Sequence, residues 1–447
     1  MRSSKFIPVY AALFILLLSM ASAALCAESG HPLRAGAAKI DITPTNLHNL
    51  NSFGGDFKAV HDPIYARALV LDNGVNTAAL VTLDLVESGD TMPVRERIQK
   101  ELGIPADHIM ITSSHDHSAP RIGSVTPGGI AHPATAENLA YTVTVFDKIV
   151  AAVKQAKSVL QPAKVGFATG TADLNINRDE LIPGRGWGQG YNPDGHSDKT
   201  VWVLKIISLD GRPIAIFFDY SSHSTVVLGT GELSGDLGGA AERFVEARFD
   251  NKIVALYSMG AAGDQNPKIM QSGGRGPESA AAALPATGTS TSHANAYDSV
   301  NAFGLVLGTE VVRVADGIKE LSSTARIEAG EKIVSCPIKK GVNQMGDLKQ
   351  DNVTSMPLHL GLILINDVAL TGVSGEVVTN IYWHLKKTSP LVNTVMLTLA
   401  NDRAGYIADD LSYDTPYFAV NGTPFARGCA EPNIVNGLSA MISEKLQ

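Results

Sequence analysis

Three hairpin-like patterns, spread over the whole chain, are the feature of this sequence that most constrains its fold. In each pattern two apolar segments are separated by a short turn of Asp, Asn or Gly, which is typical of neighbouring antiparallel strands. The paired segments are 66–71 with 77–85, 201–209 with 213–219, and 360–365 with 368–373. These pairs predict extensive, partly antiparallel sheet rather than a simple doubly wound fold.

Helical patterns lie between the strand pairs. One begins at Pro93, runs to Leu102 and stops before Gly103, an order that favours a helix start and end. A longer one places apolar residues on one face at spacings of four and three: Leu139, Val143, Phe146, Val150 and Val153. We therefore expect an α/β fold, with mixed, partly antiparallel sheets, helices packed around them, and a single large catalytic domain.

The N-terminus has the residue order of a secretory signal peptide. Arg2 and Lys5 precede an apolar run at 9–18, and small residues follow at 21–24. An uncleaved membrane anchor is the alternative, but the apolar run is short for a membrane span. We expect residues 1–27 to be a signal peptide and 28–447 the mature domain, exported to the periplasm or the extracellular space.

The composition argues against two broad classes of protein. The chain carries 36 Lys and Arg against 44 Asp and Glu, a net charge of −8, so we expect no nucleic-acid partner. An apolar fraction of 45% and a charged fraction of 18% are those of a globular protein, which excludes wholesale disorder. Segment 271–296, rich in Gly, Ser, Ala, Thr and Pro, is predicted to be a flexible surface loop, with an interdomain linker as the alternative.

Cysteine usage limits the kinds of metal site that the chain can build. The chain has three cysteines, Cys26, Cys336 and Cys429, and the first lies in the predicted signal peptide. The other two could form a disulfide or remain buried thiols, and the sequence leaves both alternatives open. Because they do not form a ligand cluster, any metal must be held by His and carboxylate groups.

Polar side chains follow several of the apolar strand segments. His115 and His117, two residues apart, leave the segment 108–111, and His223 follows the second hairpin. Glu376 follows the third hairpin, where a carboxylate needs a partner such as a metal. Each of these groups alone has a structural alternative as a hydrogen-bonded loop residue. Together they predict a His and carboxylate metal site.

Several short motifs occur in a fixed order between residues 38 and 413. They include His-Asp-Pro-Ile-Tyr-Ala-Arg-Ala at 61–68, Ser-His-Asp-His-Ser-Ala-Pro at 114–120 and Asn-Arg at 177–178. Further members are His-Ser-Thr at 223–225, Ser-Gly-Asp at 234–236, Ser-Gly-Glu at 374–376 and Gly-Tyr at 405–406. In this order they resemble the motifs of the neutral/alkaline, non-lysosomal ceramidases, for example that family's Thr-His-Thr-His-Ser-Gly-Pro and Asn-Arg-Ser-Pro.

The resemblance implies a zinc site with two His, one Glu and one Tyr as ligands. By position these are His115, His223, Glu376 and Tyr413, with His117 and Arg178 contacting the polar part of the substrate. Zinc would polarise the amide carbonyl and activate a water molecule. Arg178, which stays protonated, would stabilise the oxyanion.

Two departures from the family pattern bear on the chemistry. The family's Gly-Asp-Val-Ser-Pro-Asn appears as Gly-Asp-Gln-Asn-Pro-Lys at 263–268, so Asn266 stands at the position of the functional serine. An amide is no nucleophile but can hydrogen-bond near the reacting atoms, and we count Asn266 and Asp264 among the catalytic candidates. The second departure is that only about thirty residues follow Tyr413, too few for an immunoglobulin-like domain of roughly 100 residues.

We therefore predict an exported, zinc-dependent amidohydrolase that resembles neutral ceramidase and cleaves an N-acyl amide, such as ceramide to sphingosine and fatty acid. Its partner would be a lipid-like or N-acyl small molecule, met with transient contact to a membrane surface. One alternative is a metal-dependent hydrolase of another ester, lactone or small N-acyl substrate. The other is a non-catalytic lipid- or glycan-binding protein with a structural zinc.

Overall fold

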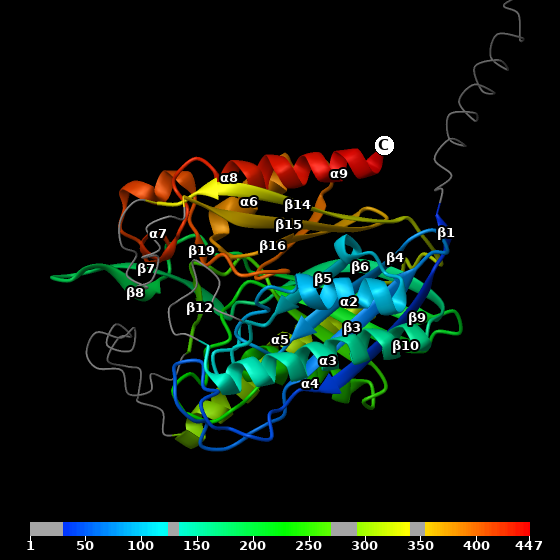
Figure 1. The fold of residues 1–447 in the computed structure, drawn as a ribbon, viewed down its shortest axis with the longest axis horizontal. Coiled ribbons are helices and arrows are strands. Elements are labelled where there is room, and N and C mark those ends of the chain that lie inside the picture. The colour runs from blue at the N-terminus through cyan, green and yellow to red at the C-terminus, as the bar shows by residue number, and fades with distance from the viewer. Residues whose placement is uncertain (1–29, 124–133, 270–292, 340–353) are drawn as a thin grey trace, which may run out of the picture.

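The structure is a computed structural model that describes residues 30–123, 134–269, 293–339 and 354–447. Two β-sheets face each other across an apolar core, and helices cover their outer faces (Figure 1). The mixed α/β fold with partly antiparallel sheets is therefore confirmed. The predicted signal peptide, 1–27, lies outside the described residues. Among the helices that are described, none has the length and apolarity needed to cross a bilayer.

The larger sheet has eight strands and contains two of the three expected hairpins. Its strands, in spatial order, are β11 (Val254–Met259), β10 (Pro213–Tyr220), β9 (Thr200–Ser208), β6 (Gln161–Thr171), β2 (Arg34–Asp41), β3 (Tyr65–Asp72), β4 (Thr77–Leu83) and β5 (Ile109–Ser113). The β3–β4 and β9–β10 pairs are antiparallel, as expected, whereas β4–β5 and β10–β11 are parallel. The sheet curves strongly, since the edge strand β11 contacts β3, β4 and β5.

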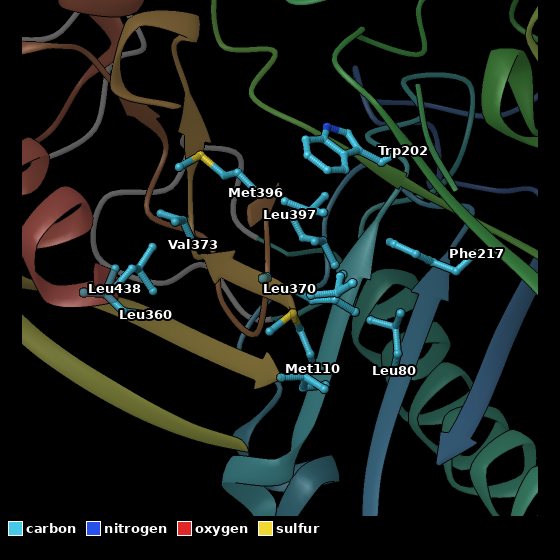
Figure 2. Packing of buried hydrophobic residues seen from close by; sticks show 14 of the residues in the cluster. Leu80, Met110, Trp202, Phe217, Leu360, Leu370, Val373, Met396, Leu397 and Leu438 are labelled. Atoms are coloured by element: carbon cyan, nitrogen blue, oxygen red, sulfur yellow. The ribbon is translucent and has the colours of Figure 1, made fainter. Parts of the chain in front are cut away.

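The smaller sheet contains the third hairpin. Its strands, in spatial order, are β14 (Ile327–Pro337), β15 (Ser355–Ile365), β16 (Val368–Val373) and β18 (Asn393–Leu397). Figure 2 shows Leu370 and Leu397 of this sheet facing the core that Met110 of the larger sheet also lines. On the outer side, Leu360 meets Leu438 of helix α9. Both faces of β15 are thus covered, which explains its continuous apolar run.

Helices cover the outer faces of both sheets. The larger sheet is covered by α2 (Met92–Leu102), α3 (Ala136–Ser158), α4 (Asp236–Arg248) and α5 (His293–Gly317). The smaller sheet is covered by α9 (Leu438–Leu446) and α6 (Thr379–Thr388). The expected helix at 93–102 is confirmed, and Gly103 ends it in the left-handed conformation with φ 70°.

Two expectations about the helices need correction. In α3, Val150 and Val153 of the expected face are buried, but Leu139 and Val143 are 47% and 62% exposed, and Val145 and Ile149 belong to the core face as well. The expected face is therefore confirmed in the second half of the helix and wrong in its first turns. The predicted loop 271–296 is wrong for its last four residues, which begin α5, because the Ala-rich start extends an apolar helix. The rest of that loop lies outside the described residues.

Short elements gather where the candidate site lies. They comprise β12 (Gln265–Pro267), β7 (Asn175–Ile182), β8 (Gly186–Asn192), β17 (Glu376–Val377), β19 (Tyr406–Ile407), η3 (Asp410–Asp414) and α7 (Phe418–Gly422). The other short elements of the described chain are β1 (His31–Pro32), β13 (Thr324–Ala325), η1 (Ala106–His108), α8 (Ala430–Pro432) and η4 (Asn433–Gly437). Cys336 at the end of β14 and Cys429 before α8 form a disulfide, so the thiol alternative is not observed.

Candidate metal centre

Three histidines from two loops meet where strands β5 and β10 end. A bridge between Asp116 and Ser224 joins the two loops, and the amide of His117 donates to the carbonyl of Ser224. His115 adopts φ 54°, an uncommon backbone conformation for a residue other than glycine. Such a conformation persists where the surroundings enforce it, and it is frequent at functional sites.

The ring nitrogens of His115 and His223 are oriented by backbone carbonyls. Nδ1 of His115 lies 2.7 Å from the carbonyl oxygen of Val86, and Nδ1 of His223 lies 2.9 Å from that of Gln265. A carbonyl oxygen only accepts, so both Nδ1 atoms carry the proton and both Nε2 atoms keep a free lone pair. This is the arrangement in which protein histidines bind metals.

Glu376, which opens β17 shortly after β16 ends, completes the cluster. Its Oε2 lies 3.2 Å from Nε2 of His115 and 3.2 Å from Nε2 of His223. All three side chains are at most 5% exposed. Two nitrogen lone pairs and a carboxylate oxygen therefore converge on one point, which is repulsive unless a proton or a cation lies between them.

The spacing of these atoms suits a small metal ion. A tetrahedral zinc ion with bonds of about 2.0–2.1 Å places its ligand atoms about 3.3–3.4 Å apart. The two nitrogen–oxygen distances of 3.2 Å are close to that value. The donor set, neutral imidazole and carboxylate, is also the one that zinc accepts. The residues present thus fit a metal ion such as zinc.

His117 is the third histidine of the cluster. Its Nε2 lies 3.1 Å from Nε2 of His115, and the three histidine ligand atoms all lie within 4.8 Å of one another. Its Nδ1 is buried and has no hydrogen-bond partner among the described residues. Burial, together with the neighbouring histidines, holds the pKa of His117 well below its usual range. His117 is therefore neutral at pH 7.

Electrostatics at the cluster favour a neutral His223 and a charged Glu376. Burial lowers the pKa of His223 to about 3, and Arg178 adds to this shift. Burial alone would raise the pKa of Glu376, but attraction to His115 and hydrogen bonds to the histidines hold it well below its usual range. These protonation states are the ones that bind a cation.

Arg178 and Asn266 lie beside the cluster. Nη1 of Arg178 lies 3.3 Å from Nε2 of His223 and donates to Oδ1 of Asn266 at 3.1 Å, while Nη2 donates to the carbonyl of Gly263. The register of β12 against β7 pairs Asn266 with Ile176, the residue two before Arg178. The guanidinium is 3% exposed and packs over the ring of Phe418 at 5.0 Å. It is thus a fixed positive charge next to the metal site.

Asp264 supports the loop rather than contacting the histidines. Its Oδ1 accepts hydrogen bonds from the amide and hydroxyl of Thr379, and its Oδ2 accepts one from Asn177. Its backbone carbonyl accepts from the amide of Arg178. These contacts position Arg178 and the start of α6, and the catalytic role of Asp264 stays a prediction.

The tyrosine predicted as a ligand, Tyr413, is not brought to the cluster. Its hydroxyl donates to the carbonyl of Phe425 at 3.0 Å, and none of its described contacts is with a histidine or Glu376. Tyr406 takes that place instead, because β17 and β19 are parallel and pair Glu376 with Tyr406. The Tyr406 hydroxyl hydrogen-bonds Glu376 and Arg178, and burial raises its pKa.

Sequence reasoning noticed the Gly-Tyr motif at 405–406 but gave it no role. A local signal existed: the tyrosine follows a glycine shortly after an apolar strand, as Glu376 does. Gly375 makes the close approach possible, because a Cβ there would lie 2.7 Å from the carbonyl oxygen of Gly405. The pairing that selects Tyr406 over Tyr413 is visible only in three dimensions.

The chain is similar to known proteins over much of its length. A family model described as "neutral/alkaline non-lysosomal ceramidase, N-terminal" matches residues 34–282. A neutral ceramidase of Drosophila pseudoobscura pseudoobscura is 24% identical over 290 residues, which cover 58% of this chain and 39% of the relative. Neutral ceramidase B of Dictyostelium discoideum is 26% identical over 263 residues, covering 52% and 35%. The chain thus spans less than two fifths of the length of these curated relatives.

A solved structure has the same fold. The neutral ceramidase of Pseudomonas aeruginosa superposes with a TM-score of 0.70 at 17% identity, over 93% of this chain and 75% of that one. A ceramidase solved as a complex with C2 gives a TM-score of 0.69, also at 17% identity. At this identity the likeness concerns the fold alone.

Proposed function

Because the chain belongs to the neutral/alkaline non-lysosomal ceramidase family, we propose that it hydrolyses N-acyl amides, ceramide first among them, with the help of a zinc ion. His115, His223 and Glu376 would hold the ion, and Tyr406 would be the fourth protein group beside it. The observation that carries this proposal is the convergence of two free Nε2 lone pairs and one carboxylate oxygen beside a fixed arginine. When bound, zinc would polarise the amide carbonyl and make a water molecule more acidic.

Arg178 would stabilise the negative charge that develops on the carbonyl oxygen. It is buried, keeps its charge and is held by Asn266 and Gly263, so it needs no rearrangement when the charge appears. Preorganised donors of this kind make a large contribution to catalysis of acyl transfer. Asn266 would orient this guanidinium, because an amide cannot act as the serine does elsewhere in the family.

His117 would move the proton. Its Nδ1 has no partner among the described residues, so it would take a proton from water and return it to the leaving amine; burial opposes the charged imidazolium, and the nearby Glu376 favours it. An amine is a poor leaving group unless it is protonated, which makes such a donor necessary. Tyr406, whose pKa is raised, would stay protonated and donate a hydrogen bond to the carboxylate of Glu376.

We further propose that residues 28–447 form the exported, mature enzyme and that it meets its lipid substrate at a membrane surface. The Cys336–Cys429 disulfide supports export, since such bonds persist in oxidising compartments. A pair of exposed apolar side chains, Leu181 at 60% and Leu411 at 77%, is available on the described surface for contact with lipid.

The test is release of fatty acid from short- and long-chain ceramides by the purified, zinc-loaded protein, with and without a chelator. We expect release that the chelator abolishes and that added zinc restores. His223→Ala should lose both metal and activity, whereas Arg178→Lys should keep the metal and lose most of the activity. Bound zinc without release from any ceramide would refute the ceramidase assignment. Turnover of esters or lactones would then favour another hydrolase, and ligand binding without turnover would favour a binding protein.

A further inference from the structure

A polar cavity of about 270 Å³ lies apart from the histidine cluster. It is bounded by β7 and β8, by the start of α6 and by the segment from β19 to α7, which lie close together in Figure 1. Asn177 and Asp179 of β7 line it, whereas the intervening Arg178 points to the histidines. Alternate residues of one strand thus serve two different sites.

The cavity is lined by more acidic than basic side chains: His196 is the one basic residue of its described lining, and the charge of Arg178 acts on Asp179 from the neighbouring position. Asp179, Asp264, Asp409 and the exposed Asp194 line it, and none of its described lining residues is Lys or Arg. Asp264 is 6% exposed and Asp409 is 3% exposed. Burial raises the pKa of Asp179 to about 7, and the nearby carboxylate of Asp264 adds to that shift. Three carboxylates brought this close repel one another unless a cation lies among them.

Two of these carboxylates present an oxygen that no described group satisfies. Oδ2 of Asp409 accepts a hydrogen bond from Ser412, but its Oδ1 is buried and has no partner among the described residues. Oδ1 of Asp179 is buried and unpartnered in the same way. Because an unpaired buried carboxylate oxygen is costly, both atoms point to a ligand. Two unsatisfied carboxylate oxygens in one cavity favour a positively charged ligand.

We propose that this cavity binds a hydrated divalent cation of the calcium class, with Asp179 and Asp409 as its carboxylate ligands. Calcium takes six to eight oxygen ligands in flexible geometry, and the side-chain oxygens of Asn177 and Ser412 are close at hand. The volume leaves room for water molecules in the remaining positions. The two proposed ligands are carboxylates, and His196 is the only imidazole among the described lining residues, so the site differs in chemistry from the histidine cluster and would favour a hard cation over zinc.

The cation would tie together three segments that carry groups of the histidine site. Asp179 follows Arg178 directly, Asp264 lies two residues before Asn266, and Asp409 lies three residues after Tyr406. Bound calcium would therefore fix the positions of these groups without touching the substrate. This positioning role rests on the proposed function, but the binding itself does not.

Terbium luminescence tests the binding directly. Tyr417 lines the cavity, and Trp187 packs against it edge-on at 4.7 Å between ring centroids, so terbium bound there would be excited through these rings. We would titrate the full-length, zinc-loaded protein with terbium and then displace it with calcium and, separately, magnesium. The expected result is a single saturable emission signal that calcium removes.

Variants locate the site. Asp409→Asn and Asp179→Asn should each weaken terbium and calcium binding by on the order of tenfold or more. Tyr417→Phe should dim the emission while calcium affinity, measured by calorimetry, is retained. Asp414→Asn, which changes an exposed acid on the same short helix, is the matched control and should have no effect. His223→Ala should also leave terbium binding intact, because that residue belongs to the histidine cluster.

The thermal midpoint of Asp409→Asn, which removes a charge without changing the shape of the side chain, gives a second readout. In chelator, Asp409→Asn should raise the thermal midpoint, because it removes repulsion, while in calcium it should lose the gain in midpoint that the wild-type protein shows. Absence of calcium or terbium binding to the wild-type protein would overturn the proposal. So would binding that Asp179→Asn and Asp409→Asn leave unchanged, or binding that disappears in His223→Ala. None of these results depends on ceramide hydrolysis, so failure here is distinct from failure of the proposed function.

Discussion

The Cys336–Cys429 disulfide joins residues 93 positions apart, and the segment it closes carries both Glu376 and Tyr406. Cross-linking a segment of this length removes conformational entropy from the unfolded chain worth about 4.7 kcal/mol at 25 °C. We therefore expect Cys336→Ala/Cys429→Ala to lower the free energy of unfolding by about that amount. The unfolding entropy of a chain of about 400 residues is roughly 0.8 kcal/mol/K, so the thermal midpoint should fall by about 5–6 °C.

The assay is calorimetric unfolding of the zinc-loaded proteins with and without a thiol reductant. Reductant should lower the midpoint of the wild-type protein toward that of the variant and leave the variant unchanged. Ser335→Ala, an exposed neighbour in β14, is the matched control for alanine substitution in this strand. Zinc content should be equal in all three proteins at 25 °C, because the cross-link acts on the unfolded chain. A double variant whose thermal midpoint equals that of the oxidised wild-type protein would refute the reasoning.

Three further predictions concern the site and the stability of the fold. Tyr406→Phe should lower the rate of amide hydrolysis, because it removes the hydroxyl beside Glu376. Tyr413→Phe should cost only about 1 kcal/mol of stability and leave the rate unchanged. Equal rates for both variants would restore Tyr413 as the candidate for the tyrosine beside the metal. Arg178→Lys should lower kcat by about 10²–10³ with zinc still bound, as expected for loss of an oxyanion donor, and unchanged kcat would exclude that role. Burial would raise the pKa of Glu331, but His359 and Arg95 lower it to about 2, below its ordinary 4.5. Its contribution to stability is therefore complete above about pH 5 and is lost as the pH falls toward 2; Glu331→Gln should flatten this part of the stability–pH profile, and an unaltered profile would contradict the assignment.

Several features followed from local sequence alone. The three hairpins were predictable because each turn and its two flanking strands lie within about twenty residues. His115, His223 and Glu376 were identifiable as a group because each follows an apolar strand, where burying a polar side chain is costly unless it has a partner. The helix at 93–102 was equally local, since Pro93 and Gly103 mark its two ends.

Other features depended on which surfaces meet. Only part of the buried face of α3 followed from sequence: Val150 and Val153 were identified, but apolar residues also occur on the exposed side of its first turns, and contact with β2 and β3 decides which of them are buried. Whether Cys336 pairs with Cys429 depended on bringing the end of β14 against the start of α8. The acidic cavity likewise combines β7, Asp264 and Asp409, which are far apart along the chain.

Sequence by itself determined the strand pairs, the helix ends and the residue types available to a metal, because these rest on interactions between neighbours in the chain. Tertiary structure alone decided that Tyr406, and not Tyr413, lies against Glu376. The register of β17 against β19 sets that choice, and it couples residues thirty positions apart through backbone pairing that carries no local signal.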